Sequence, residues 1–197
     1  NKNDGMKGAY LGPEYSNEDI QSYMDKKGYI YKKLKDEEFS ETIADLIVDQ
    51  KVIGWCQGRM EFGPRALGSR TIIGDARSSE MQKTMNLKIK YRESFRPFAP
   101  SVRAENISDY FELDRESPYM LLVANVKKDK QVPISEKQNS YCGLEKLNVV
   151  RSEIPAITHV DYSARIQSVN GITNPRYHKM LTKFNDKYDC PVIVNTS

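Results

Sequence analysis

Long apolar runs and paired cysteines are scarce in this sequence, and each scarcity excludes a class of protein. The longest apolar stretch, SPYMLLVANV at 117–126, has only the length of a strand, so no segment is expected to cross a membrane. The N-terminal NKNDGMKGAYLG has no apolar core and is not expected to be a signal peptide. The three cysteines, Cys56, Cys142 and Cys190, form no CxxC pair, which argues against a zinc knuckle or a disulfide framework. A reducing, cytoplasmic setting is the simplest interpretation.

Histidine is also scarce, with only His159 and His178 present. A His-rich metal site is therefore not available, and no Ser-His-Asp or Cys-His nucleophile set is apparent. His178 falls in the middle of an expected helix and is interpreted as a surface residue. His159 and Asp161 share one face of an expected strand with Ser163 and Arg165, because alternate strand residues point to the same side. That polar face either lines a pocket or meets solvent at a sheet edge, and the sequence leaves both open.

A glycine-rich phosphate loop is absent as well. The motif GRMEFGPRALGSR at 58–70 places Gly63 and Gly68 at the separation of a Walker A loop. However, Ser69 stands where the loop needs lysine, and Arg70 stands where it needs a Mg²⁺-binding hydroxyl. Any phosphate bound here is therefore expected to be held by side chains.

The net charge of the chain is small, but its positive charge is unevenly distributed along the sequence. The formal net charge is +3, yet residues 59–103 carry ten Lys/Arg against four Asp/Glu, and the remainder carries twenty against twenty-three. All the excess positive charge therefore lies in one block. Such a block indicates a discrete anionic ligand more than a general polyanion surface.

Two arginines in the basic block lie beside proline, which fixes the local backbone and helps to aim the side chain. Arg65 follows Pro64, and Arg96 precedes Pro97. A guanidinium group forms two parallel hydrogen bonds to phosphate or carboxylate oxygens and stays charged when desolvated.

The stretch NLKIKYRESFRPFAP at 86–100 places Lys90, Arg92 and Arg96 among aromatic residues. Apolar neighbours lower the local dielectric and strengthen charge contacts. The alternative is a solvated charged face, which is the usual position of a charge run. Proline and the aromatics favour the pocket.

Secondary structure is predicted from periodicity and capping signals. We expect a helix between an N-cap at Ser16 and a stop at Gly28, with Ile20, Tyr23 and Met24 facing inward. Further helices are expected at about 37–50, 78–90 (capped by Ser78 or Ser79), 105–111 and 174–189. Strands are expected at 29–34, 52–58, 71–76, 119–126, 158–169 and 191–197, an extended stretch at 95–102 and a mobile loop at 127–151. Interleaved strands and helices predict an α/β (α+β) class with a mixed sheet.

The chemistry-bearing segments together resemble a known family. They are GRMEFGPRALGSR, NLKIKYRESFRPFAPSV, SPYML, THVDYSARIQSV, NPRYHKML and PVIVNTS. In this order they closely resemble the C-terminal domain of the O-carbamoyltransferases, which include nodulation-factor, tobramycin-type and cephamycin-type carbamoyltransferases. The resemblance covers nearly the whole chain from LGPEYS onward.

The resemblance implies a YrdC-like open, twisted mixed sheet with flanking helices. Such a domain uses ATP, with Mg²⁺, and carbamoyl phosphate to form carbamoyl adenylate. An N-terminal domain of the same protein, holding Fe²⁺ or a similar metal, then transfers the carbamoyl group to a hydroxyl. On this basis residues 1–15 are expected to be a linker from a missing N-terminal domain. Residues 16–197 are expected to be the YrdC-like domain, truncated at its C-terminus.

Carried over by position, the resemblance also implies a set of catalytic and ligand-binding residues. These residues, expected to line the carbamoyl phosphate and ATP pocket, are Arg65, Lys90, Arg96, Arg165 and Ser197. Residue chemistry alone favours the four cations, whereas Ser197 comes only from the resemblance. Arg65 and Arg96 are expected to clamp phosphate, Lys90 to supply a point charge, and Arg165 to orient the carbamoyl or carboxylate group.

Two other classes of function remain open. A YrdC-like module that binds RNA without catalysis would use the basic block and its aromatics, and its affinity would fall steeply with salt. A non-catalytic interaction module is disfavoured because the costly cations are all present. The acceptor hydroxyl compound and the oligomeric state are not predicted.

Overall fold

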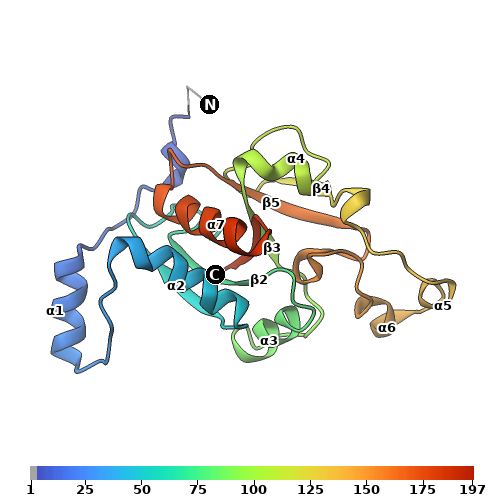
Figure 1. Ribbon diagram of the computed structural model, residues 1–197, viewed down its shortest axis with the longest axis horizontal. Coiled ribbons are helices and arrows are strands. Elements are labelled where there is room, and N and C mark those ends of the chain that lie inside the picture. Colours follow the sequence, from blue (N-terminus) through green and yellow to red (C-terminus); the bar gives the residue numbers. More distant parts are fainter. Residues whose placement is uncertain (1–3) are drawn as a thin grey trace.

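The centre of the molecule is an open, mixed, six-stranded sheet (Figure 1). The computed structural model describes residues 4–197. The strands are β1 (Ile53–Cys56), β2 (Arg70–Asp75), β3 (Ala99–Arg103), β4 (Leu122–Asn125), β5 (Ser163–Val169) and β6 (Val192–Thr196). Their order in the sheet is β1-β2-β6-β3-β5-β4; β3 and β5 are parallel, and the other neighbours in this order are antiparallel. The predicted α/β class with a mixed sheet is confirmed.

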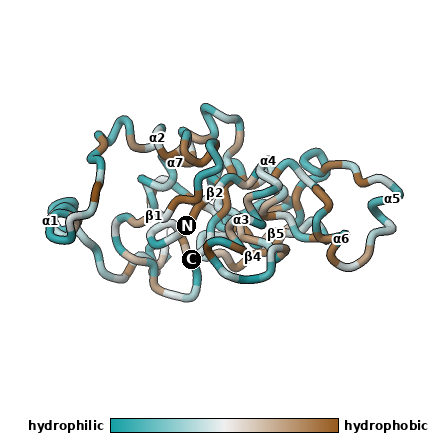
Figure 2. The backbone as a smooth tube through the Cα atoms, turned by 90° about the horizontal axis from the view of Figure 1, so that it is seen from below, coloured by the Kyte–Doolittle hydropathy of each residue, from teal (hydrophilic) through white to brown (hydrophobic). Residues whose placement is uncertain are grey.

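Helices flank this sheet and extend beyond both of its ends. The α-helices are α1 (Asn17–Lys27), α2 (Asp36–Val48), α3 (Met81–Lys88), α4 (Ile107–Tyr110), α5 (Glu136–Asn139), α6 (Gly143–Leu147) and α7 (Pro175–Tyr188). Short 3-10 helices are η1 (Lys7–Ala9), η2 (Ala104–Asn106), η3 (Lys128–Lys130) and η4 (Pro155–Ile157). Figures 1 and 2 both place α1 and α5 at opposite extremes of the molecule. None of the helices within residues 4–197 is long and apolar enough to traverse a bilayer.

The helices α2 and α7 pack together over one face of the sheet (Figure 1). Helix α7 buries an apolar stripe at the spacing of one helix face, which removes that stripe from water and stabilises the packing. Aromatic rings fill the interface: Trp55 of β1 lies 5.4 Å from Phe39 and 5.4 Å from Tyr177, measured between ring centroids. The stripe consists of Tyr177, Met180, Leu181 and Phe184.

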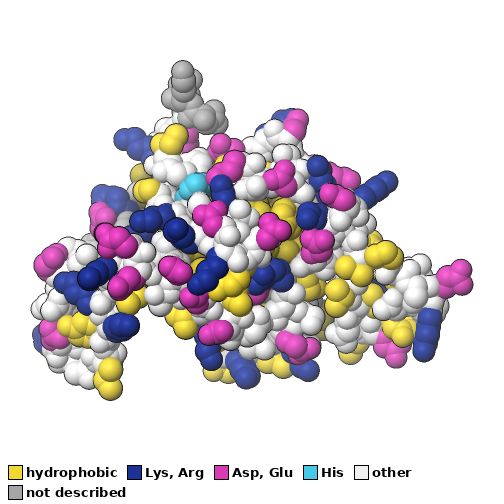
Figure 3. Space-filling model, in the orientation of Figure 1, with side chains coloured by type: hydrophobic (Ala, Val, Ile, Leu, Met, Phe, Trp, Pro, Cys, Tyr) yellow, Lys and Arg dark blue, Asp and Glu magenta, His cyan; other side chains and the backbone are white. Residues whose placement is uncertain are grey.

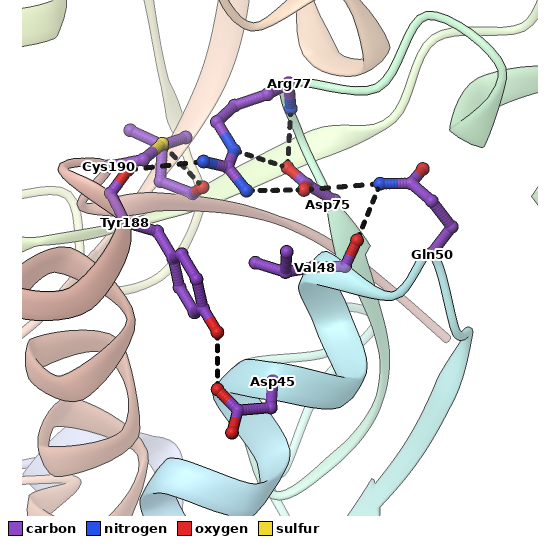
Figure 4. A network of polar contacts seen from close by, with 8 residues as sticks. Asp45, Val48, Gln50, Asp75, Arg77, Tyr188 and Cys190 are labelled. Atoms are coloured by element: carbon purple, nitrogen blue, oxygen red, sulfur yellow. Dashed lines mark hydrogen bonds and ion pairs between the residues drawn. The ribbon is translucent and has the colours of Figure 1, made fainter.

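Polar contacts tie the ends of α2, β2 and α7 together (Figure 4). The buried Asp75 of β2 accepts two hydrogen bonds from the guanidinium of Arg77, which also donates to the Tyr188 carbonyl at the end of α7. The Tyr188 hydroxyl in turn donates to Asp45 of α2 at 2.5 Å. Burial raises the pKa of the adjacent Cys190 thiol to about 11, so this cysteine stays protonated at neutral pH.

The first helix forms as predicted but does not pack as predicted. Ser16 and Asp19 make a reciprocal capping box, and Gly28 ends α1 in the left-handed region at φ 67°. None of the α1 side chains is buried, and Ile20 and Tyr23 are 45% and 55% exposed. The expected inward face of α1 is therefore wrong for this chain, because local capping decides where a helix forms but not what covers it.

Two other expectations are corrected by the structure. Residues 29–34 form no strand, since they find no pairing strand and Ile30 is fully exposed. Neither Ser78 nor Ser79 caps the third helix, which begins at Met81 after Glu80 without a side-chain cap. The remaining predicted strands and the helices at 37–50, 105–111 and 174–189 are present, with shorter or shifted bounds.

Residues 127–151, predicted as a mobile loop, contain η3, α5 and α6 and project from the sheet (Figure 1). We call this segment the arm. Its two ends are joined by hydrogen bonds from Val132 N to Arg151 O (2.8 Å) and from Glu153 N to Lys130 O (3.0 Å). The arm therefore leaves and rejoins the body of the molecule at adjacent points.

The segment before α1, expected to be a linker, contacts the body. Residues 1–3 lie outside the described part of the chain. Ala9 is buried and accepts a hydrogen bond from Phe62 N at 2.7 Å, and the Tyr10 hydroxyl donates to Leu67 O at 2.7 Å. This segment thus packs against the loop that follows β1 and supports it.

Candidate anion-binding site

A cavity of about 200 Å³ lies where β6 ends beside the start of β3, with Ala99 paired to Asn195. Its wall contains four cationic side chains and, within the described residues, no Asp or Glu side chain. The lining residues are Pro64, Arg65, Ala66, Lys90, Arg92, Pro97, Phe98, Ala99, Met120, Arg165, Asn195, Thr196 and Ser197.

One side of the cavity is formed by residues 58–70, which we call the GPR loop. The buried Glu61 carboxylate accepts hydrogen bonds from three backbone N–H groups, those of Leu67 (2.6 Å), Ser69 (3.3 Å) and Arg70 (2.9 Å). The loop therefore folds around its own carboxylate, which leaves Arg65 exposed at the cavity.

The three arginines of the GPR loop have different surroundings. Arg70 donates through both terminal nitrogens to the carbonyls of Gln57, Gly58, Pro13 and Ser69, so its guanidinium is fully used in holding backbone. Arg59 is exposed and does not line the cavity. Only Arg65 among them is available to a ligand there.

A buried polar network fixes the GPR loop to the sheet. Asn195 of β6 donates to Ala66 O (2.8 Å) and to Gln167 (2.7 Å), and Gln167 of β5 donates to Leu67 O (2.8 Å). Both side chains are about 99% buried, so each hydrogen bond replaces solvation that burial removed. The backbone on either side of Arg65 is thereby held in one place.

Close packing at Gly68 fixes the far end of the same loop. Gly68 has φ +93°, and a Cβ atom there would lie 2.4 Å from the ring of Tyr177. Glycine is required because both the left-handed backbone and the approach of α7 exclude a side chain.

Arg165 reaches the cavity from β5. Its Nε is buried and has no hydrogen-bond partner among residues 4–197. Burial, and then the positive charge of Arg65, lower the pKa of Arg165. Both guanidinium groups line the same cavity, so their like charges repel, and an anion between them would relieve that repulsion.

The other side of the cavity is formed by residues 89–97, which we call the basic segment. Lys90 lines the cavity, and its Nζ donates to the Ser197 carbonyl, so these two residues, each expected to line the pocket, lie together. Arg92 also lines the cavity, with its guanidinium carbon 4.9 Å from the Phe98 ring centroid.

Arg96 is the one predicted site residue that does not line the cavity. Its side chain is 55% exposed and lies 3.8 Å from Glu93, a weak contact between two solvated groups. The structure thus brings together Arg65, Lys90, Arg165 and Ser197, and leaves Arg96 outside. Arg92 and Asn195 were not among the predicted site residues.

The predicted polar strand face at His159 is wrong. Residues 160–162 form a turn, and β5 begins only at Ser163, because the Asp161 carboxylate accepts hydrogen bonds from the Ser163 backbone and hydroxyl. Burial lowers the pKa of His159, but neither His159 nor Asp161 lines the cavity. His178 of α7 is partly buried and contacts Glu105 at 3.0 Å.

The arrangement is suited to binding an anion rather than a protein-held metal. Within residues 4–197 no group of three or more His, Cys, Asp or Glu side chains is placed to hold a metal ion. Converging cations in a confined space bind phosphate or carboxylate oxygens through charge-assisted hydrogen bonds.

Comparison with known proteins assigns the class. Residues 44–197 match the model of the carbamoyltransferase C-terminus, which is more than half of the chain and contains every residue that lines the cavity. The chain belongs to the carbamoyltransferase C-terminal family.

Individual relatives are considerably longer than this chain. An uncharacterised protein of Synechocystis, sll1178, is 55% identical over 198 residues, covering 100% of this chain but 32% of that protein. Nodulation protein NolO of Bradyrhizobium diazoefficiens is 37% identical over 197 residues, covering 96% of this chain and 32% of the relative. A 3′-hydroxymethylcephem-O-carbamoyltransferase of Streptomyces clavuligerus is 37% identical over 147 residues, covering 75% of this chain and 24% of the relative. The chain therefore spans about a third or less of these relatives' length.

Proposed function

We propose that the cavity binds the phosphate groups of carbamoyl phosphate and ATP, and that the chain forms carbamoyl adenylate from them. The observation that carries the proposal is the convergence of Arg65, Lys90 and Arg165 on one cavity whose described lining has no Asp or Glu side chain. Cations gathered in a confined site are costly unless a ligand supplies the opposite charge. The membership of the family supports a carbamoyl compound as that ligand.

The size of the cavity limits what it holds. At about 200 Å³ it is smaller than ordinary ligand pockets, which measure roughly 300–1,000 Å³. It therefore suits a small phosphorylated molecule or part of a triphosphate, and the nucleoside of ATP is proposed to lie outside its mouth.

In the proposed reaction, water cleaves carbamoyl phosphate to carbamate and inorganic phosphate. A carbamate oxygen then attacks the α-phosphorus of ATP, and the bond from that phosphorus to pyrophosphate breaks. Catalysis comes from positioning and charge stabilisation, since phosphoryl transfer requires little acid–base chemistry. Arg65 and Arg165 bind oxygens of the two anions, Lys90 adds a point charge, and Ser197 completes the rim. Arg96 is proposed to turn inward once an anion is bound, exchanging its weak contact with Glu93 for a stronger one.

Mg²⁺ is expected to accompany ATP, but the cavity offers it no Asp or Glu side chain within the described residues. The residues present do not fit a protein-held Mg²⁺, because this ion prefers carboxylate oxygens and phosphates. We therefore assign no residue to the ion.

The test is calorimetric titration of the 197-residue chain with carbamoyl phosphate, and then ATP, at low salt. Arg165→Gln should weaken carbamoyl phosphate binding about tenfold or more, since a charged hydrogen bond is worth about 1.5–3 kcal/mol. The exposed Arg115→Gln, which removes the same charge away from the cavity, is the matched control. Wild-type protein that binds neither ligand, or equal affinities for the two variants, would falsify the proposal.

Transfer of the carbamoyl group to a hydroxyl acceptor is proposed for the longer protein, in an N-terminal domain with Fe²⁺ or a similar metal. The proposal is supported by the greater length of the relatives, one of which is by name an O-carbamoyltransferase. The 197-residue chain should catalyse carbamoyl phosphate–dependent ATP–pyrophosphate exchange without modifying an acceptor. Exchange seen only in a longer protein would restrict the proposal to that form.

Nucleic-acid binding is the alternative function. On the face shown in Figure 3, Lys and Arg side chains are interspersed with Asp and Glu rather than gathered in a single-sign field. A polyanion site usually presents a continuous basic surface. Tight RNA binding with a steep salt dependence, unaffected by carbamoyl phosphate, would favour this alternative instead.

A further inference from the structure

The basic segment contains one cation whose surroundings differ from those of the structural arginines. Arg92 uses only its Nε in a protein hydrogen bond, to the side-chain oxygen of Asn86 at 2.5 Å. Within residues 4–197, its two terminal nitrogens have no protein acceptor and no ion-pair partner. Arg70, by contrast, has carbonyl acceptors for both terminal nitrogens, and Arg77 is paired with the Asp75 carboxylate (Figure 4).

Asn86 is completely buried in the last turn of α3, and within the described residues its side-chain hydrogen bonds all go to the turn that carries Arg92. Its side-chain nitrogen donates to Ser94 O (3.1 Å) and Arg96 O (2.7 Å). Its backbone carbonyl accepts a hydrogen bond from Arg92 N (3.1 Å). The turn needs this support because the exposed Tyr91 has φ +48°, which is unfavourable for a residue with a side chain.

The partner of Arg92 is an amide rather than a carboxylate, and this difference has a chemical consequence. An amide oxygen orients the guanidinium without cancelling its charge, whereas a carboxylate would do both. The Phe98 ring, 4.9 Å from the guanidinium carbon, supports the same orientation from the side. Burial, and then the charge of Arg96, lower the pKa of Arg92, and the opposite effect of the Glu93 charge does not outweigh them.

We propose that Arg92 is a ligand-binding residue that grips a phosphate group in the cavity through its two terminal nitrogens, and that Asn86 is the positioning residue that aims it. This inference rests on the proposed binding of phosphorylated ligands. It adds a fourth cation to Arg65, Lys90 and Arg165. The site then favours dianionic phosphate groups over monoanions, since one ligand must satisfy several donors.

The experiment compares the affinity of the 197-residue chain for carbamoyl phosphate and for pyrophosphate among charge-matched variants. Arg92→Gln should weaken both affinities about tenfold or more. Arg92→Lys keeps the charge but loses the fork, and should recover only part of that loss. Lys88→Gln removes an exposed positive charge from α3 outside the cavity, and should change affinity less than about twofold. Thermal unfolding of the same samples verifies that each variant is folded.

The outcomes separate this inference from the proposed function. Failure of the wild-type chain to bind either probe overturns both. Wild-type binding together with an Arg92→Gln affinity within twofold of it overturns only the role of Arg92.

Asn86 is tested by a double-mutant cycle, which removes its general effect on stability from the comparison. Asn86→Ala should weaken carbamoyl phosphate binding severalfold in the wild-type background and add no further loss to Arg92→Gln. An equal loss in both backgrounds would mean that Asn86 acts through the Ser94 and Arg96 backbone, and would overturn its role in aiming Arg92.

Discussion

The two sides of the cavity are built on opposite plans. The GPR loop surrounds a buried carboxylate, Glu61, and is bonded to β5 and β6 through Gln167 and Asn195. The basic segment is joined to the body chiefly through Asn86, and both Tyr91 and Arg96 are exposed. The comparison indicates that the conformation of the GPR loop is fixed before a ligand binds, whereas the basic segment can adjust around the ligand.

Replacing Glu61 should cause the largest loss of stability. Glu61→Ala leaves three backbone N–H groups without their acceptor, so we expect a loss of about 3–5 kcal/mol in the free energy of unfolding. Glu93→Ala, an exposed carboxylate of the basic segment, should cost less than about 0.5 kcal/mol. Urea denaturation measures both, and similar losses would contradict the difference between the two sides.

A methyl group at Gly68 should have the next largest effect. Gly68→Ala places a Cβ atom 2.4 Å from the Tyr177 ring at φ +93°, and should destabilise the fold by about 2–4 kcal/mol. Gly63→Ala in the same loop has φ +130° but no neighbour within 4 Å, so only the backbone strain of about 1 kcal/mol applies. Equal effects would mean that the close approach of α7 is not what fixes the loop.

Glu105, which follows the end of β3 that lies away from the cavity, should make the stability of the protein depend on acid pH. Burial opposes ionisation of Glu105, but hydrogen bonds from its own backbone, Arg103 and His178 outweigh it and lower the pKa to about 2. Because 4.5 is the ordinary value, ionised Glu105 stabilises the fold above about pH 4.5, and this contribution disappears as the pH falls toward 2. Glu105→Gln should flatten the urea midpoint over that window without changing ligand affinity. An unchanged pH profile would contradict the assignment.

The smallest expected effect on stability is that of Arg96. Its side chain is 55% exposed and its only ion pair, within residues 4–197, is 3.8 Å long, so Arg96→Gln should change the free energy of unfolding by less than about 0.5 kcal/mol. If the basic segment adjusts around a bound anion, the same variant should still weaken carbamoyl phosphate binding, though less than Arg92→Gln does. An affinity equal to that of the wild type would remove Arg96 from the site.

Much of the fold follows from local signals, and the exceptions have physical causes. The capping box at Ser16 and the stop at Gly28 fix α1, because these signals act within a few residues. The exposure of Ile20 and the turn at Asp161 depend on which packing and hydrogen-bond partners other residues provide. The periodicity of a segment does not predict those partners.

The candidate site divides in the same way. Cationic residue types and proline neighbours pointed to Arg65 and Arg96, yet only Arg65 lines the cavity. Which side of the basic segment faces inward is decided by Asn86, a residue whose type gives no signal in the sequence. The sequence identifies Arg92 as part of the basic motif, but its neighbours in the sequence do not show that Arg92, rather than Arg96, lines the cavity.

The arm is a part of the chain whose length can change without disturbing the sheet. Since Val132 and Arg151 are joined across its base, the chain enters and leaves the arm at nearly the same point. Loop-closure entropy grows only slowly with length, so homologous chains can shorten or extend this excursion at little thermodynamic cost. Differences in length among the relatives are therefore expected to accumulate at 133–150, where evolution can remodel the outer contour of the molecule without displacing a single strand.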